Sequence, residues 1–371
     1  MQPDDSQKAD AYYNQAVEYL NSNNIDSAIK KLELVVSLTP NNFDALADLG
    51  NLLNQKERYV EAETILLKAC NIDNSDASVH YCLGKALKYQ NRIEKAIEHY
   101  KICCELEEHD VYLMDIAYAQ ITALYRQTNC KKEAKAYYQK WAKAVTNNPV
   151  PRVFLDILGK RITDQLPVGF VRQEFDYFAE TFDRTLERIH YIGPQEVSKI
   201  LASYIPQANS SLSVLDLGCG TGLCASILKP YSHWLCGVDL SAKMLEKAKL
   251  LNVYDELFES DAVEYLKKQT TAFDLISVAD VFPYFGNIEE LLSSISIALK
   301  RNGMLIFSFE ELTNSLKNWS INDSGRFQHR LNYIKKYLKK NKISIISCES
   351  IGYRYEGGQP IPGVFIAAQK T

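Results

Sequence analysis

Hydrophobic residues in the first third of the chain follow the spacing of amphipathic helices, and this pattern repeats. Three consecutive blocks of 34 residues are in register: Ala9–Asn42, Phe43–Asp76 and Ala77–Asp110. Polar turns such as Ser22-Asn23-Asn24 divide each block into two helical stretches. The pattern therefore predicts a row of stacked helix pairs, an all-α solenoid.

The repeat is also visible at single positions. Each block has a small residue at its eighth position, alanine at its twentieth and a large residue four positions later. These residues are Ala16, Gly50 and Gly84; Ala28, Ala62 and Ala96; and Leu32, Leu66 and Tyr100. Small residues allow two helices to approach closely, and large ones fill the space between neighbouring pairs. A fourth, degenerate block over Asp115–Asn148 requires four additional residues, Val111–Met114, before it.

The blocks resemble tetratricopeptide (TPR) repeats over residues 9–148, with an unrelated helical bundle as the alternative. The resemblance implies a non-catalytic module whose concave face binds a protein or peptide. Candidate residues on that face are Tyr12, Tyr19, Asn51 and Lys85, and each has simple packing or solvation as its alternative.

A turn with two prolines, Asn147–Pro151, ends the repeats. The next stretch, Arg152–Lys160, has helical apolar spacing and predicts a helix that caps the last repeat. We therefore expect a linker with a capping helix over residues 149–169 and a second domain over residues 170–371.

The second half alternates short apolar runs with longer amphipathic stretches, which predicts an α/β sheet with helices on both faces. The expected strands are Ser213–Leu217, Trp234–Asp239, Leu257–Ser260, Phe273–Ala279, Gly303–Glu310, Ile343–Tyr355 and Val364–Gln369. No long helix separates the last two, so they are expected to form an antiparallel pair.

A glycine-rich turn follows the first of these strands, in Val214–Gly222. Gly218 and Gly220 permit a tight turn and close approach of the backbone to a ligand. A helix starting near Gly222 would direct its N–H groups toward an anionic group. A dinucleotide site would need glycine where Leu223 stands, so the spacing disfavours a nicotinamide enzyme.

This run, with Asp216 two residues before the first glycine, resembles motif I of class I S-adenosylmethionine (SAM) methyltransferases over residues 175–370. The resemblance implies a Rossmann-like, mostly parallel seven-stranded sheet with an antiparallel last strand, and SAM as cofactor. Asp239 would hold the ribose hydroxyls and Asp261 the adenine amino group. The cofactor-binding residues implied are Asp216, Gly218, Cys219, Gly220, Gly222, Asp239, Leu240, Met244, Asp261, Ala262 and Asp280. Each aspartate has a helix cap or turn as its alternative role.

A narrower resemblance is to bacterial TPR-containing predicted methyltransferases, a group whose substrate is not settled. It rests on the runs Phe175–Asp183, Val281–Gly286, Phe307–Glu310 and Gly325–His329.

Methyl transfer requires an acceptor aligned with the S–CH₃ bond in a site that excludes water, and a general base only when the acceptor starts protonated. The catalytic candidates near the strand ends are Asp280, Tyr284 and His329, and the substrate-binding candidates are Arg326 and Glu310. A capping or solvated histidine is the alternative for His329. Tyr177 and Phe182 either close over the cofactor or pack in the core.

The 371 residues carry a formal net charge of -4, and the nine cysteines show no metal-ligand spacing. These features predict reduced thiols, no metal and no nucleic-acid partner. We find no signal peptide or membrane span, so we expect a cytoplasmic protein with no membrane partner. The expected function is a SAM-dependent methyltransferase with a TPR interaction module, acting on a protein or a small-molecule acceptor. The alternative is a non-catalytic scaffold that retains the fold.

Overall fold

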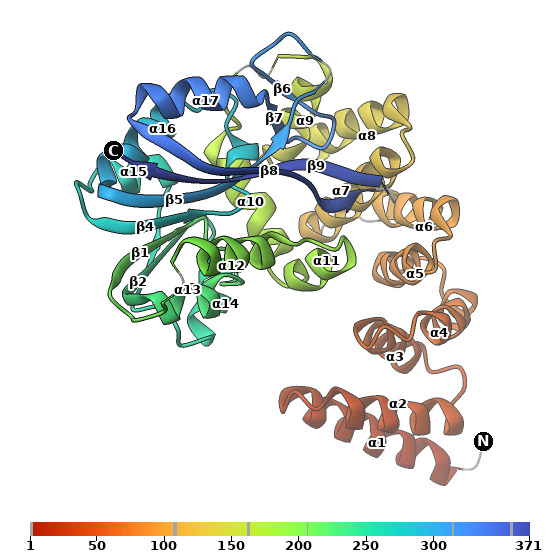
Figure 1. Cartoon of the computed structure of the whole chain (residues 1–371). Helices are drawn as coiled ribbons and strands as arrows, with labels where there is room; N and C mark the ends of the chain where they lie inside the picture. Colours follow the sequence, from red (N-terminus) through yellow and green to blue (C-terminus); the bar gives the residue numbers. More distant parts are fainter. Residues whose placement is uncertain (1–2, 107–109, 162–163, 206, 314, 357–358) are drawn as a thin grey trace. The chain divides into compact units, whose positions relative to one another are not determined.

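The chain folds into two compact units, Met1–Asn148 and Pro149–Thr371. The structure, a computed structural model shown in Figure 1, describes all residues except 1–2, 107–109, 162–163, 206, 314 and 357–358. Each unit is considered separately below.

The described part of the first unit contains eight helices that pack as four consecutive pairs. They are α1 (Pro3–Asn21), α2 (Ile25–Leu38), α3 (Phe43–Gln55), α4 (Tyr59–Ile72), α5 (Ala77–Tyr89), α6 (Ile93–Leu106), α7 (Val111–Gln127) and α8 (Lys131–Ala144). Asn42 and Asp76 fix the starts of α3 and α5, because their side chains accept hydrogen bonds from backbone amides of the first turn. Helix α7 starts at Val111, so the four residues expected as an insertion before the fourth block extend its first helix instead.

The predicted pairing of small and large residues is confirmed. A Cβ atom added to Gly50 would lie 2.5 Å from Leu66 Cδ2, and one added to Gly84 would lie 2.9 Å from Tyr100 Cδ1. Real side chains do not approach so closely, so glycine is what allows α3 to contact α4 and α5 to contact α6 in this way. Within the described residues, no helix is both long and apolar enough to cross a membrane.

The second unit is built on one mixed sheet in which the described residues form nine strands. They are β1 (Leu212–Leu217), β2 (Ser232–Asp239), β3 (Glu256–Glu259), β4 (Phe273–Val278), β5 (Leu299–Glu311), β6 (Trp319–Ile321), β7 (Phe327–His329), β8 (Ile343–Glu356) and β9 (Gln359–Lys370). Strands β3, β2, β1, β4 and β5 are parallel neighbours in that order. Strand β9 is antiparallel to β5 and to β8.

Two strands were not predicted, so the sheet has nine strands instead of seven. Strands β6 and β7 have three residues each and form an antiparallel hairpin, and β7 pairs in parallel with the end of β5 at Glu310 and Glu311. Runs of three residues are too short to show an alternating pattern. This hairpin brings Arg326 and the residues beside it to the carboxyl end of the sheet.

Helices cover both faces of the sheet (Figure 1). They are α9 (Val150–Leu158), α10 (Val168–Phe178), α11 (Phe182–Arg188), α12 (Gly193–Tyr204), α13 (Ala225–Leu228), α14 (Ala242–Leu250), α15 (Ala262–Leu266), α16 (Glu289–Ala298) and α17 (Leu331–Lys340). Short 3₁₀ turns follow at Lys229–Tyr231 and Phe282–Tyr284. Alternate residues of the buried strands enter two separate apolar cores, with Leu215 and Ile276 on one face and Val214 and Leu275 on the other.

Two expected elements differ. Helix α9, expected as a cap on the repeats, belongs to the second unit, where the Phe154 ring packs edge-on against Phe170 at 5.6 Å. The helix expected from Gly222 is only the four-residue α13, which starts at Ala225. The turn between Gly222 and Ala225 therefore leaves no long helix whose N-terminus could bind an anion.

Candidate functional site

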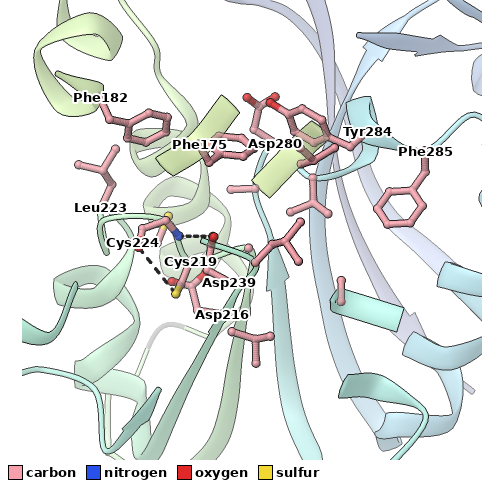
Figure 2. Close-up of a pocket in the computed structure, with 18 of the residues that line it drawn as sticks. Phe175, Phe182, Asp216, Cys219, Leu223, Cys224, Asp239, Asp280, Tyr284 and Phe285 are labelled. Atoms are coloured by element: carbon pink, nitrogen blue, oxygen red, sulfur yellow. Dashed lines mark hydrogen bonds between the residues drawn. The ribbon is translucent and has the colours of Figure 1, made fainter. Parts of the chain in front are cut away.

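The carboxyl ends of β1, β2 and β4 open into a cavity of about 300 Å³ (Figure 2). Because parallel strands place the loops after them at one edge of the sheet, residues distant in sequence meet there. Helices α10 and α11 contribute Phe175 and Phe182 to the opposite wall. The cavity is therefore apolar on the helix side and polar at the strand ends.

The glycine-rich loop after β1 has left-handed backbone, which favours glycine, at two cavity-lining positions. Gly218 and Gly220 have φ values of 74° and 55°. A Cβ atom on Gly218 would lie 2.2 Å from Val281, whereas one on Gly220 would approach only Phe182, at 3.7 Å. The backbone at Gly220 therefore faces open space in which a ligand can contact it directly.

Gly222, predicted to bind cofactor, does not line the cavity. Its φ is 94°, and a Cβ atom there would lie 2.6 Å from Leu251 and 3.2 Å from Tyr254. It is needed for the turn and for packing against these two side chains.

Asp239 joins two loops at the bottom of the cavity. Its Oδ2 accepts a 2.8 Å hydrogen bond from the Gly220 amide, and its Oδ1 accepts a 2.9 Å bond from the Ser241 amide. Burial raises the pKa of Asp239, although these backbone bonds favour the ionised form and partly oppose the shift. Each carboxylate oxygen has a further lone pair with which to accept a ligand hydroxyl.

Asp216 also lines the cavity but is nearly inaccessible, with 2% of its surface exposed. It accepts a 2.7 Å hydrogen bond from the Tyr254 hydroxyl. The pKa of Asp216 is raised to about 7: burial and the nearby Asp239 charge raise it, and the bond from Tyr254 partly opposes them. The Asp216 carboxylate, which the resemblance assigns to the cofactor, is thus held in position by the Tyr254 hydroxyl.

Asp261 caps a helix and also lines the cavity. Its Oδ1 accepts the amides of Val263 and Glu264, at 2.9 and 3.1 Å, and so caps α15. It also lines the cavity, together with Ala262, Leu240 and Cys219. The cap orients the carboxylate on the cavity wall.

Met244 does not line the cavity. Its side chain is fully buried in the unit, and its amide donates to Ser241 Oγ at the start of α14. Met244 therefore packs in the core beneath the loop that Ser241 begins.

A network of charged and phenolic groups forms one wall of the cavity. The Arg326 guanidinium bonds to the carboxylates of Asp280 and Glu310 and donates a 2.8 Å bond to the Tyr284 hydroxyl. Arg354 donates a 2.7 Å bond to Glu310. Burial alone would raise the pKa of Glu310, but the charges of Arg326 and Arg354 outweigh it and lower that pKa.

Glu310, predicted to bind substrate, lies behind this wall. It is fully buried and does not line the cavity, whereas Arg326, Asp280 and Tyr284 do. Its carboxylate fixes the two arginines and is not available to a ligand.

Asp280 follows β4 with a φ of 62°, a left-handed conformation that is unusual for a residue with a side chain. Its amide donates a 2.9 Å hydrogen bond to Ser308 Oγ, which holds the turn. Such strained backbone is concentrated at functional sites. The turn directs the Asp280 carboxylate toward Tyr284 at the cavity edge (Figure 2).

His329, predicted as catalytic, lies in the core. It is fully buried, its Nε2 is 3.2 Å from the Gly286 carbonyl oxygen, and its ring stacks on Tyr333. Burial lowers its pKa to about 4, so the ring is neutral at physiological pH. It does not line the cavity, and its position gives it no contact with a ligand there.

Side-chain hydrogen bonds join helices α10 and α11 to the loops after β2 and β1. Ser241 Oγ donates to Asp176 at 2.5 Å, and Thr221 Oγ1 donates to Asp183 at 2.6 Å. Of the two aromatic residues proposed to close over the cofactor, Phe182 lines the cavity, whereas Tyr177 is 40% exposed and lies away from it.

Sequence patterns missed Arg354, Tyr353 and the pair of aspartates on α10 and α11. The only signal for Asp176 and Asp183 was their place in the run Phe175–Asp183, and Arg354 reaches the cavity only because β8 joins the sheet through β9. In the described residues, no cluster of three or more His, Cys, Asp or Glu side chains is arranged to hold a metal ion.

Two parts of the chain match known families. Residues 186–341 match a methyltransferase domain, and residues 16–110 match the TT21 fifth ARM repeats domain. The second match supports helical repeats of ARM type, so the assignment to TPR repeats in particular stays a prediction.

Curated relatives resemble part of the chain. An uncharacterized protein of Haemophilus influenzae is 35% identical over 35% of this chain and 56% of its own length. The malonyl-[acyl-carrier protein] O-methyltransferase of Bacillus anthracis is 28% identical over 38% and 55%, and the ubiquinone biosynthesis O-methyltransferase of Histophilus somni is 27% identical over 41% and 63%. The chain thus spans little more than half the length of these relatives.

Among solved structures, magnesium protoporphyrin IX methyltransferase from Synechocystis PCC 6803 is similar over 55% of this chain and 99% of its own, with 19% identity and a TM-score of 0.44. The family match, together with the glycine loop and Asp239 at the end of β2, identifies the fold of the second unit. This chain therefore combines an N-terminal helical repeat array with a Rossmann-like domain that has the fold of SAM-dependent methyltransferases.

Proposed function

We propose that the protein transfers the methyl group of SAM to an acceptor bound in the cavity of the second unit. The observation that carries this proposal is the bond between the Gly220 amide and Asp239, beside open backbone at Gly220. Joined in this way, the glycine loop can bind the amino-acid part of a ligand while the neighbouring aspartate binds its ribose. The hydrogen-bonding groups that line the cavity are complementary to those of SAM.

Each residue of the cavity has a part in this function. The backbone of Gly218 and Gly220 would contact the amino-acid end of SAM, Asp239 would accept the ribose hydroxyls, and Asp261 and Ala262 would contact the adenine. When bound, SAM supplies a methyl group activated by a sulfonium. Phe175 and Phe182 cover the cavity and exclude water, which strengthens every polar interaction within it.

The names of the relatives support transfer to oxygen. The proteins of Bacillus anthracis and Histophilus somni described above are both O-methyltransferases. We extend this chemistry to the present chain as part of the proposal.

The repeat array would serve as an interaction module for a protein or peptide. Helices α1, α3 and α5 carry the candidate contacts Tyr12, Asn51 and Lys85, and Lys31 lies 5.0 Å from the centre of the Tyr12 ring. Aromatic and cationic groups of this kind can hold a partner through stacking and hydrogen bonds.

Incubation of the full chain with methyl-labelled SAM and cell extract tests the proposal. We expect label in an extract component, absent without the protein and strongly reduced with the Asp239→Ala variant. Label in the low-molecular-weight fraction would identify a small-molecule acceptor, and label in the protein fraction a protein acceptor. No transfer, together with no binding of SAM, would contradict the proposal and support the non-catalytic scaffold.

A further inference from the structure

The charges of Asp280, Arg326 and Arg354 on the cavity wall and of Glu310 behind it balance one another. Two carboxylates face two guanidinium groups, and Glu310 and Arg354 are almost completely buried. Arg326 donates to four groups: Asp280, Glu310 and the hydroxyls of Tyr284 and Tyr353. An acceptor with its own charge would therefore place an unpaired charge beside an already neutral cluster, which is unfavourable in a buried site.

Two hydrogen-bonding positions on this wall are still open. Asp280 Oδ1 accepts from Arg326 and Tyr353, but Oδ2 of the same carboxylate has no partner among the residues that the structure describes. The Tyr284 oxygen accepts from Arg326 Nη1, and its own hydrogen has no acceptor in that part of the chain. Both side chains line the cavity, and both are bonded to the same Arg326 guanidinium group.

One acceptor and one donor in adjacent positions are complementary to a hydroxyl group. A ligand O–H can donate to Asp280 Oδ2 while its oxygen accepts from the Tyr284 hydroxyl. A carboxylate offers no hydrogen to Asp280, and an ammonium group offers no acceptor to Tyr284. The pair thus selects a hydroxyl over either charged group.

The surroundings of this pair favour an aromatic hydroxyl. Phe175 packs edge-on against the Tyr284 ring at 5.3 Å and against Phe182 at 6.1 Å, and Phe285 also lines the cavity. Aromatic rings prefer such edge-on and offset contacts with one another. An aromatic ring that bears a hydroxyl can pack against these phenylalanines while its hydroxyl bonds to Asp280 and Tyr284.

We propose that Asp280 and Tyr284 bind the phenolic hydroxyl of an aromatic acceptor, which makes the enzyme a phenol O-methyltransferase. This inference rests on the proposed function. The phenol oxygen forms a bond to the methyl carbon as the S–CH₃ bond breaks, and the sulfur keeps the electron pair of that bond. The phenolic proton passes to Asp280 Oδ2 and from there to water. Tyr284 orients the oxygen through its hydrogen bond.

Three probes of similar size test the acceptor class: catechol, benzoate and benzylamine, each incubated with the full chain and SAM. We measure formation of S-adenosylhomocysteine and identify the methylated product. Catechol is expected to give a monomethyl ether, with kcat/KM at least about 10-fold above that of either charged probe. Preferential methylation of benzoate or benzylamine would overturn the inference.

Two variants test the assigned residues. Asp280→Asn and Tyr284→Phe should each lower kcat/KM for catechol by roughly 10- to 100-fold, while the Kd of the Tyr284→Phe variant for S-adenosylhomocysteine stays within about 2-fold. Tyr204→Phe, at an exposed position on α12 outside the cavity, is the matched control and should leave both values unchanged. Full activity of both cavity variants would overturn the inference.

A further result separates this inference from the proposed function. If S-adenosylhomocysteine binds but no probe is methylated, the phenol assignment is wrong and cofactor binding stands. If S-adenosylhomocysteine does not bind, the proposed function itself is wrong.

Discussion

The amide of Gly220 donates a 2.8 Å hydrogen bond to Asp239 Oδ2, so the loop after β1 is joined directly to the end of β2. The other oxygen of the same carboxylate accepts the amide of Ser241, which begins the loop before α14. One side chain therefore holds together two loops that line the cavity. Such preorganisation reduces the entropy that binding would otherwise lose.

Replacing Asp239 by alanine should weaken binding of S-adenosylhomocysteine. The variant loses the acceptor for a ligand hydroxyl and the tie between the two loops. Hydrogen bonds to charged groups contribute about 1.5–3 kcal/mol, so we expect Kd to rise by roughly 10- to 100-fold. Isothermal titration calorimetry measures this change.

Asp274→Asn is the control for that experiment. Asp274 lies at the start of β4, where it accepts from the Ser213 amide and Lys300, and it does not line the cavity. This variant should bind with unchanged Kd. Equal Kd values for Asp239→Ala and the wild type would show that Asp239 does not hold the ligand.

Asp216 should make the unfolding free energy of the second unit fall as pH rises. An aspartate in the unfolded chain ionises near pH 4, whereas burial raises the pKa of Asp216 in the folded chain to about 7. Between these values the folded state binds more protons, so stability is lost as pH rises toward 7. The loss between pH 5 and pH 8 is roughly 2–3 kcal/mol.

Urea unfolding at the two pH values checks this. Both the otherwise wild-type chain and the Asp216→Asn variant carry Trp141→Phe, so that the tryptophan fluorescence comes from Trp234 and Trp319 of the second unit. The Asp216→Asn variant should lack most of the pH-dependent loss. A wild type and variant with the same pH dependence would contradict the raised pKa.

Thr221→Val should loosen α11. The substitution keeps the shape of the side chain and removes the hydroxyl that donates to Asp183 at 2.6 Å. A hydrogen bond to a carboxylate contributes about 1.5 kcal/mol, so its loss corresponds to roughly 10-fold more local opening of α11. Hydrogen exchange of α11 amides, followed by mass spectrometry, measures it.

Thr185→Val provides the comparison on the same helix. Its hydroxyl bonds only to the Thr181 carbonyl one turn earlier, at 2.8 Å. Exchange in α11 should be nearly unchanged in this variant. Similar acceleration in both variants would mean that Thr221 does not fasten the helix.

Gly50→Ala should destabilise the repeat array. The added Cβ atom would lie 2.5 Å from both Cγ and Cδ2 of Leu66, which forces α3 and α4 apart. Overpacking of this kind costs about 1–3 kcal/mol, which faster hydrogen exchange in α3 and α4 will reveal. Gly169→Ala in α10 has no atom within 4 Å of the added Cβ and should be neutral or stabilising. Undiminished protection in Gly50→Ala would contradict the packing described here.

Features that depend on the repeat length or on the ends of predicted strands could be predicted from the sequence. The contacts of Gly50 with Leu66 and of Gly84 with Tyr100 follow from a repeat of 34 residues. Asp239 ends one predicted strand and Asp261 follows the next, the positions at which the resemblance assigned them to the cofactor, and both line the cavity. In these cases one local pattern determines both the element and the position of the side chain.

Features that depend on pairing between distant strands were not predictable. Glu310 and Arg354 meet only because β9 lies between β5 and β8, and their full burial as an ion pair has no signature in a hydropathy pattern. His329 was assigned to the site because β7 was not recognised, and the hairpin of β6 and β7 places it in the core. Local sequence patterns do not specify which charged side chains become buried when distant strands pair.

A crystal structure of the full chain with S-adenosylhomocysteine tests the central claim most directly. We predict the ligand in the cavity at the ends of β1, β2 and β4, with its amino-acid end along Gly218–Gly220 and both ribose hydroxyls within hydrogen-bonding distance of Asp239. A ligand bound elsewhere, or side chains filling this cavity at saturating ligand, would contradict the account.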